Sequence, residues 1–176
     1  LDLLFADAAA GDERVLTFFG GEPLLHVGRI RRLAQRSQQR AADLGVRLRL
    51  MLVTNATLLD ESAVDLLVEH AFQVAVSVDG GPAAHDVNRR FGDGRPSFEE
   101  TARGIGLLLA RAPDLWVRAF AVVDPANVDL WVDSVDALLE LGLWDQAFNL
   151  NVHTPWSPAS RARFDRAFTG VADRYI

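Results

Sequence analysis

Length, composition and charge exclude several classes of protein. The 176 residues suffice for one ordinary domain and are too few for two. The net charge of −6, from 18 basic and 24 acidic side chains, argues against a nucleic-acid-binding protein that works through a basic surface. With 49% hydrophobic residues the chain is expected to fold around a sizeable core, and no apolar run is long enough to cross a bilayer.

The cysteine and methionine counts indicate that the chain is part of a longer protein. Cysteine is absent, so these residues offer no disulfide, zinc-thiolate or iron–sulfur ligand. The only methionine is Met51, and residue 1 is a leucine in an apolar, helix-like run. We therefore expect an excerpt of a longer protein. No secretory signal precedes the first predicted strand, which favours a cytoplasmic location.

The hydrophobic pattern predicts strands that alternate with helices. Residues 1–10 have the pattern of the last turns of a helix, with Gly11 as its left-handed cap. Short β-branched and aromatic runs predict strands at residues 15–19, 48–53, 72–78, 115–123 and 147–152. Helical spacing predicts helices at residues 26–44, 60–70, 97–112, 127–141 and from 157 onward. The polar, glycine-rich stretch 79–96 is expected to be a long loop.

Capping residues mark the predicted helix starts. Asp60, Asn127 and Ser157 are expected to accept hydrogen bonds from the first backbone N–H groups of their helices. Ser97 and Glu100 form a Ser-x-x-Glu capping box.

This alternation predicts an α/β fold with a parallel sheet. Right-handed crossovers between parallel strands suit either an open, doubly wound sheet or a piece of a β/α barrel. In both architectures ligands gather at the carboxyl ends of the strands. The loops that follow the strands are therefore the places to search for chemistry, although Gly, Asn, Asp and Pro in such loops are also ordinary turn residues.

The loop after the first predicted strand has a specific chemical meaning. Gly20 and Gly21 let the backbone approach a ligand closely. Their carbonyl groups, together with the Glu22 carboxylate, would form a cluster of acceptors. Such a cluster recognises an ammonium group rather than a phosphate.

Three strand ends carry motifs that resemble one known family. The segments are residues 18–25 (FFGGEPLL), 53–60 (VTNATLLD) and 76–80 (VSVDG). In order and spacing they resemble successive strand ends of the radical S-adenosylmethionine superfamily. The resemblance is to the peptide- and protein-modifying branch with a C-terminal SPASM domain, which includes the anaerobic sulfatase-maturating enzymes. It covers nearly the whole chain and implies that residues 1–176 form strands two to six of a partial β/α barrel.

The resemblance also implies a binding site for S-adenosylmethionine. Gly20, Gly21 and Glu22 would hold the methionyl amine, and Ser77 would bond the ribose hydroxyls.

Further residues of this site follow from the same resemblance. Arg89 would pair with the methionyl carboxylate, which suits the fork geometry of a guanidinium, and Arg90 is the alternative. Leu150 would pack on the adenine. Pro23 and Asn55, within the first two motifs, complete the expected cofactor-binding set.

Two residues are candidates for contact with a substrate. Asp79 ends the third predicted strand and would either face the substrate or hold its loop by an Asx turn. His153 lies in the last rim loop. Only His85 and His153 among the four histidines occupy rim loops, and neither lies in a metal-binding repeat, so we assign no metal ligands.

The sequence departs from the family by lacking the Cys-x-x-x-Cys-x-x-Cys loop that binds a four-iron four-sulfur cluster. We expect this loop upstream and the cysteine-rich SPASM region downstream. The resemblance implies that the parent protein uses a 5′-deoxyadenosyl radical to modify a peptide or protein side chain. An electron donor such as ferredoxin or flavodoxin would be its partner.

Two alternatives from other classes remain at this point. A barrel without a cluster would act as a peptide-binding module, and a metal-dependent hydrolase would use the same rim with bound metal.

Overall fold

The computed structural model describes residues 1–174 and contains one five-stranded sheet. Its strands are β1 (Glu13–Phe18), β2 (Arg47–Thr54), β3 (Gln73–Val76), β4 (Val117–Val123) and β5 (Asp145–Leu150). The helices are α1 (Asp2–Phe5), α2 (Val27–Leu44), α3 (Glu61–Glu69), α4 (Pro82–Asn88), α5 (Phe98–Arg111), α6 (Trp131–Glu140) and α7 (Pro158–Ala172). Two short 3-10 helices, η1 (Pro23–His26) and η2 (Val128–Leu130), precede α2 and α6.

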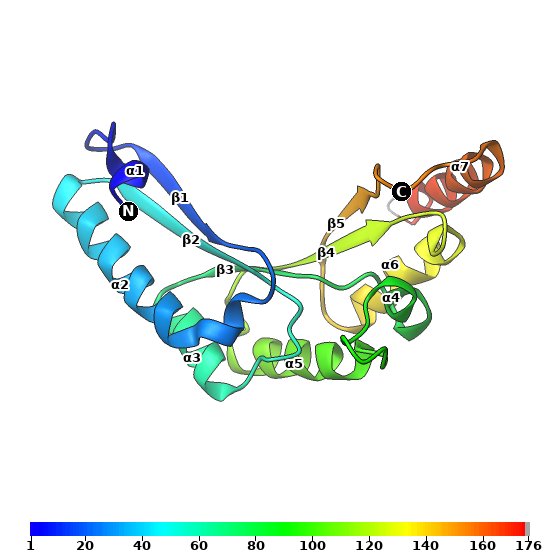
Figure 1. The fold of residues 1–176 in the computed structure, drawn as a ribbon, viewed down its shortest axis with the longest axis horizontal. Helices are drawn as coiled ribbons and strands as arrows, with labels where there is room; N and C mark the ends of the chain where they lie inside the picture. The colour runs from blue at the N-terminus through cyan, green and yellow to red at the C-terminus, as the bar shows by residue number, and fades with distance from the viewer. Residues whose placement is uncertain (175–176) are drawn as a thin grey trace.

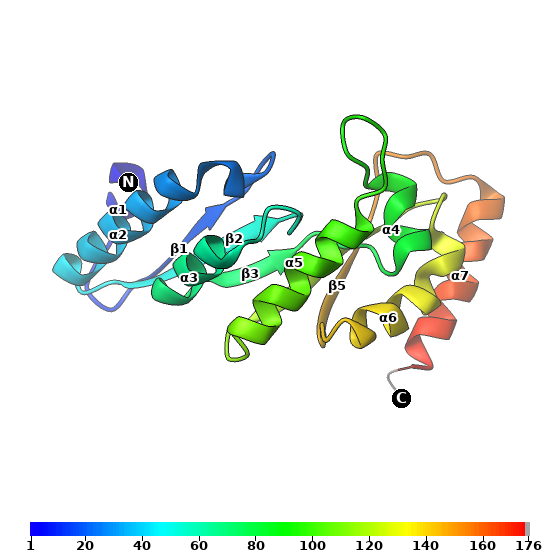
Figure 2. The ribbon, with the colours of Figure 1, turned by 90° about the horizontal axis from the view of Figure 1, so that it is seen from below.

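The sheet has the topology of a barrel segment. Its order is β1-β2-β3-β4-β5, and each neighbouring pair is parallel. The strands curve, and α2, α3, α5 and α6 lie along the convex side (Figures 1 and 2). A doubly wound sheet would carry helices on both faces, so the structure decides between the two predicted architectures. The predicted α/β fold, an open piece of a barrel, is confirmed.

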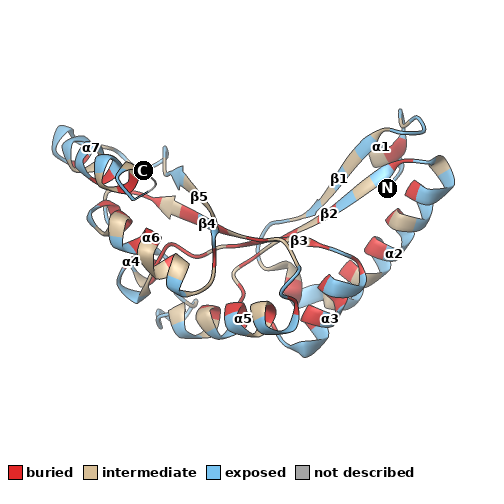
Figure 3. Ribbon diagram, turned by 180° about the vertical axis from the view of Figure 1, so that it is seen from behind, coloured by how far each residue is buried: buried red, intermediate tan, exposed pale blue. Residues whose placement is uncertain are grey.

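The core lies between the convex face of the sheet and the helices. In β2, Leu50 and Leu52 are buried against this layer, whereas Met51 between them and Val53 after them are only partly covered. This alternation follows from the two-residue period of a strand. Figure 3 shows buried residues along the central strands and on the helices that cover the sheet. Leu66 and Leu67 of α3 are fully buried in the same cluster. A second, aromatic cluster centred on Trp131 joins α6 to α7.

The parallel register brings the carboxyl ends of β2 and β3 to one edge. Thr54 pairs with Val76, and the N–H of Ser77 donates to the carbonyl of Thr54 at 2.8 Å. Residues that follow these strands therefore become neighbours although they are distant in sequence.

Two predicted caps are confirmed. Asp60 accepts a hydrogen bond from the N–H of Ala63 at 2.8 Å, and Ser157 accepts one from the N–H of Ser160 at 3.1 Å. Gly45 ends α2 in the left-handed conformation, with a φ angle of +67°.

The predicted capping box at the start of α5 is wrong. Ser97 makes no side-chain cap, and the N–H groups of Ser97 and Phe98 instead donate to Oδ1 of Asp86, at 2.8 and 3.0 Å. This carboxylate comes from α4, so the predicted loop 79–96 contains a helix that we missed. Pro82 stands in its first turn, where the absent N–H of proline costs no hydrogen bond.

Two further expectations need correction. The first helix ends at Phe5 rather than near residue 10, and Gly11 does not cap it; its N–H donates to the carbonyl of Gly45 at 2.8 Å. Asn127 does not cap a helix either. Its side chain accepts from the N–H of Asp124 and donates to the carbonyl of Val122, which closes the turn after β4.

Candidate functional site

A cavity of about 290 Å³ opens at the carboxyl ends of β1, β2 and β3. Its wall consists of residues from the three loops that follow these strands: Phe19, Gly20, Gly21, Val53, Thr54, Asn55, Ser77 and Arg89. Five of the eight predicted cofactor-binding residues are in this set. The rule that parallel strands present ligands at their carboxyl ends therefore located the cavity.

The glycine pair forms one wall through its backbone conformation. Gly20 and Gly21 have φ angles of +97° and +53°, in the left-handed region that favours glycine. A side chain added at either position would meet no atom within 4 Å. The space beside the pair is therefore open to a ligand, and the backbone itself is exposed to it.

Glu22 does not line the cavity but holds its wall together. Its Oε1 accepts from the N–H of Leu24 at 3.0 Å and from Oγ1 of Thr54 at 2.8 Å, and its Oε2 accepts from the N–H of Asn55 at 2.8 Å. These bonds tie the loop after β1 to the end of β2. A carboxylate has about four acceptor positions, so one remains for a ligand. Pro23, also outside the cavity, begins η1.

Asn55 is fixed as a turn residue in the wall. Its Oδ1 accepts from the N–H and from Oγ1 of Thr57, at 3.0 and 2.7 Å, which forms an Asx turn. Its carbonyl accepts from Oγ1 of Thr101 in α5 at 3.0 Å.

Arg89 reaches the cavity from the end of α4 and forms a two-bond ion pair with Asp79. Its Nε lies 2.7 Å from Oδ2 and its Nη2 lies 2.9 Å from Oδ1 of that carboxylate. The side chain of Asp79 is 1% exposed and also accepts from the N–H of Val122 in β4 at 2.8 Å. The Asx turn that we expected as one role of Asp79 is therefore wrong, because its carboxylate bonds Arg89 and Val122 instead. Arg90, the alternative to Arg89, donates to the carbonyl of Gly94 at 3.0 Å instead.

A second cavity of about 230 Å³ adjoins the first, because Asn55 and Arg89 line both. His85, which is 1% exposed, lies in its wall. Burial disfavours the protonated ring and lowers the pKa of His85 from its usual 6.5 to about 4, against the attraction of Asp79. Its Nε2 lies 3.1 Å from Oγ of Ser97, and that hydroxyl donates to the carbonyl of Arg89 at 2.9 Å. A neutral His85 therefore donates from Nε2.

The comparisons with known proteins agree with this geometry. Residues 3–125, which include every residue that lines the first cavity, match the family model described as "Radical SAM superfamily". This match spans more than half of the chain. The chain belongs to the radical SAM superfamily. The predicted resemblance is thereby confirmed at the level of the superfamily.

Similar proteins include serine-type anaerobic sulfatase-maturating enzymes. The enzyme of Klebsiella aerogenes is 35% identical over 103 residues, which are 58% of this chain and 25% of that protein. The enzyme of Bacteroides thetaiotaomicron is 31% identical over 127 residues, which are 72% of this chain and 30% of that protein. The radical SAM chain described here therefore spans less than a third of these two relatives.

Solved structures share its fold. Native anSMEcpe with bound AdoMet superposes with a TM-score of 0.82 at 20% identity, over 98% of this chain and 49% of that one. The same enzyme with bound AdoMet and the Cp18Cys peptide gives a TM-score of 0.75 at 22% identity, over 88% and 45%. At this identity the likeness shows that the radical SAM fold is shared.

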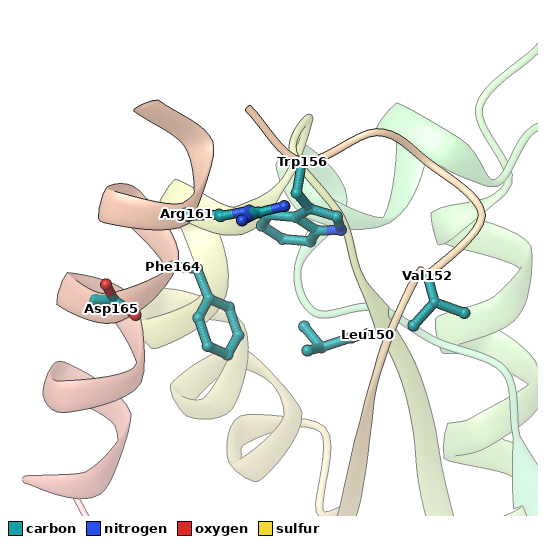
Figure 4. Close-up of a pocket in the computed structure, with 6 residues that line it drawn as sticks. All are labelled: Leu150, Val152, Trp156, Arg161, Phe164 and Asp165. Carbon is teal, nitrogen blue, oxygen red and sulfur yellow. The ribbon is translucent and has the colours of Figure 1, made fainter. Parts of the chain in front are cut away.

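Two predicted site residues lie away from the radical SAM cavity. Leu150, at the end of β5, lines a separate, largely apolar pocket of about 480 Å³ between β5 and α7 (Figure 4). Phe164 and Trp156 form its other walls and meet edge to face, with ring centroids 5.8 Å apart. His153 is exposed on the loop before α7.

Sequence reasoning missed the role of Thr54. This residue is 2% exposed, donates to Glu22 and accepts from the N–H of Ala56 at 3.0 Å. The signal that could have found it is a hydroxyl side chain at the end of an otherwise apolar strand.

Within residues 1–174 no three His, Asp or Glu side chains come together in a group that could hold a metal ion. No helix in the same part of the chain is long and apolar enough to span a membrane.

Proposed function

We propose that this chain is the part of a radical SAM peptide or protein maturase that binds the amino-acid and ribose portions of S-adenosylmethionine. The observation that carries the proposal is the convergence of the Gly20–Gly21 loop, Ser77 and Arg89 on one cavity at three neighbouring strand ends. The glycine pair follows β1, whereas Ser77 and Arg89 belong to the segment after β3, and each group matches one chemical feature of that cofactor.

The chemistry of the wall fits the ligand. The backbone carbonyls of Gly20 and Gly21 and the remaining acceptor position of Glu22 suit the ammonium group. Arg89 suits the carboxylate, because a guanidinium binds carboxylates through two parallel N–H groups. The hydroxyl of Ser77 suits the ribose. When bound, S-adenosylmethionine supplies the radical chemistry of the superfamily, in which a hydrogen atom is removed from a substrate.

An iron–sulfur cluster does not fit the residues present, because the sequence contains no cysteine. We propose that the cluster-binding loop and the cysteine-rich SPASM region belong to parts of the parent protein outside these 176 residues.

A peptide or protein is the substrate class that we propose for the parent. Three relatives are named serine-type anaerobic sulfatase-maturating enzymes, and two structural neighbours were solved with a peptide. These names favour a maturase over a peptide-binding module or a metal-dependent hydrolase. We further propose ferredoxin or flavodoxin as the electron donor and the reducing cytoplasm as the location.

Titration of the chain with S-adenosylmethionine, followed by NMR of its backbone amides, tests the cofactor site. We expect the ligand to shift resonances of Gly20, Gly21 and Ser77. The double variant Glu22→Ala/Ser77→Ala should weaken binding on the order of tenfold or more, since it removes the Ser77 hydroxyl and the carboxylate that ties the loop after β1 to the end of β2. Asp93→Asn, an exposed position outside both cavities, is the control and should bind like the wild type.

The absence of cysteine makes this titration specific. No cluster contributes to the affinity, so the measurement reports on the side chains and backbone of this chain alone. Equal affinity in the double variant and the wild type would defeat the site assignment.

A further inference from the structure

We propose that Asp79 is a positioning residue that holds the guanidinium of Arg89 ready for the carboxylate of the ligand. This inference rests on the proposed function, and it gives the buried carboxylate a role that no comparison assigns. Asp79 does not touch the ligand. It acts by fixing the orientation of the Arg89 guanidinium.

The geometry of the ion pair leaves one edge of Arg89 free for a second carboxylate. Asp79 takes the side of the guanidinium that carries Nε and one hydrogen of Nη2, at 2.7 and 2.9 Å. A guanidinium has five N–H donors in one plane. Of the three that remain, one on Nη1 and one on Nη2 point along the edge between these two nitrogens, which is the second of its two carboxylate-binding edges. Arg89 also lines the cofactor cavity. One arginine can therefore join the protein carboxylate to the ligand carboxylate.

Asp79 is itself fixed by two strands. It follows β3 in the sequence, and its Oδ1 accepts a hydrogen bond from the N–H of Val122 in β4 at 2.8 Å. Only 1% of its side chain is exposed, so water does not compete for these bonds. The carboxylate is thus a rigid anchor rather than a mobile surface group.

Arg89 is fixed at its backbone as well. Its N–H donates to the carbonyl of His85 at 2.9 Å, and its carbonyl accepts from Oγ of Ser97 at 2.9 Å. A free arginine side chain loses rotamer entropy when it binds a ligand. Because both ends of Arg89 are held before the ligand arrives, that loss occurs on folding and not on binding.

The chain contains a matched pair that lacks these features. Arg95 likewise donates from Nε to the carboxylate of Asp93, at 2.8 Å, but these side chains are 63% and 57% exposed and lie outside both cavities. Exposed pairs of this kind contribute little to stability. The Asp93→Asn substitution therefore controls for the loss of one carboxylate near an arginine.

Two ligands that differ only in the carboxylate separate positioning from folding. S-adenosylmethionine and decarboxylated S-adenosylmethionine are titrated, with NMR detection, into the wild-type chain and into Asp79→Asn, Arg89→Met, the double variant and Asp93→Asn. The amide introduced by Asp79→Asn keeps the volume of the carboxylate and can still accept from the N–H of Val122, so the fold is retained. Thermal unfolding of each protein is recorded beside the titrations.

We expect Asp79→Asn to weaken binding of S-adenosylmethionine on the order of tenfold, the usual effect of losing one charge-assisted contact. Its affinity for the decarboxylated ligand should stay within about twofold of wild type. Arg89→Met should show the same selective loss. The double variant should lose no more than Arg89→Met alone, because Asp79 then has nothing to position.

A second readout needs no ligand. In the wild type the Nε–H of Arg89 is bonded to a buried carboxylate and should exchange slowly with water. In Asp79→Asn its NMR signal should broaden or disappear, whereas the signal of Arg95 should be unchanged.

Three results would overturn the inference, and they differ from a failure of the proposed function. Equal weakening of both ligands by Asp79→Asn would show a structural role only. Unchanged binding of both would show no role, and additive losses in the double variant would show that Asp79 acts independently of Arg89. Failure of the wild type to bind either ligand would instead overturn the proposed cofactor site, and this inference with it.

Discussion

Oγ1 of Thr54 lies 2.8 Å from Oε1 of Glu22 and donates a hydrogen bond to it, which joins the last residue of β2 to the loop after β1. The two residues are 32 positions apart in the sequence. Their bond sets the distance between two walls of the cavity, so the shape of the proposed cofactor site depends on a buried hydroxyl.

Thr54→Val should therefore weaken both the fold and the site. The substitution removes the donor to Glu22 and the acceptor for the N–H of Ala56. We expect a loss of about 1–3 kcal/mol in the free energy of unfolding in urea, because partners that stay buried lose their hydrogen bonds. Affinity for S-adenosylmethionine should fall in the same variant. Thr169→Val, on the exposed side of α7, should change neither quantity; equal losses in both variants would contradict the prediction.

Two glycines of α5 should respond to alanine with opposite signs. A Cβ at Gly104 would lie 2.1 Å from the carbonyl oxygen of Ala56, whereas one at Gly106 would meet nothing within 4 Å. Gly104→Ala should cost about 1–3 kcal/mol of stability through this clash. Gly106→Ala should add up to about 1 kcal/mol, because alanine is the better helix former. The midpoints of urea unfolding measure both, and a stabilised Gly104→Ala would disprove the close approach of α5 to the turn after β2.

Stability should depend on pH through His85. Its pKa is about 4 in the folded protein and near 6.5 in the unfolded chain, so the unfolded state binds more protons between these values. The stability that results from keeping His85 neutral is fully present above about pH 6.5 and is lost as the pH falls toward 4. The shift in the pKa of His85 corresponds to roughly 3 kcal/mol at most in the free energy of unfolding.

A variant isolates this contribution from the carboxylates that titrate in the same range. The free energy of unfolding is measured from pH 4 to 7 in the wild type and in His85→Gln, and the difference between the two curves should grow with pH. His153→Gln, at an exposed position, is the control for the loss of one histidine. A flat difference for His85→Gln would show that burial does not suppress its protonation.

The start of α5 offers a test of a cap that acts across two helices. Asp86→Ala removes the acceptor for two backbone N–H groups and should cost about 0.5–2 kcal/mol, as loss of an N-cap does. Glu100→Ala, which removes the side chain that the sequence motif favours, should cost little. Thermal unfolding compares them, and a larger loss in Glu100→Ala would restore the capping box.

The strands, most of the helices and two of the caps could be predicted because residues close together in the sequence determine them. Strands that alternate with helices at this spacing require parallel pairing, and Asp60 and Ser157 lie three residues from the N–H groups that they cap. The choice between a doubly wound sheet and a barrel segment needed the order of the strands, which no periodicity contains. Asp86 caps α5 from 11 residues away, so a motif read along the chain assigned that cap to the wrong residue.

The site was predictable as far as the strand-end rule and the family motifs reach. They placed Gly20, Ser77 and Arg89 together, and the structure agrees. They could not predict that Asp79 pairs with Arg89, because this pair forms only when α4 folds. The sequence around α4 is rich in glycine and polar residues and therefore has the pattern of a loop. The pocket that Leu150 lines could not be predicted for a similar reason, since Arg161, Phe164 and Asp165 of its wall come from α7.

The bond from Val122 to Asp79 has a consequence for the order of synthesis. Every residue that lines the proposed cofactor cavity has left the ribosome once Arg89 has emerged, so the outline of the cavity can form from the first three strands. The anchor of Arg89 is completed only when β4 is added beside β3. In a nascent chain that stops before residue 117, the cavity should therefore be present while the side chain of Arg89 is still mobile. The carboxylate of the ligand should be recognised only after β4 has been synthesised.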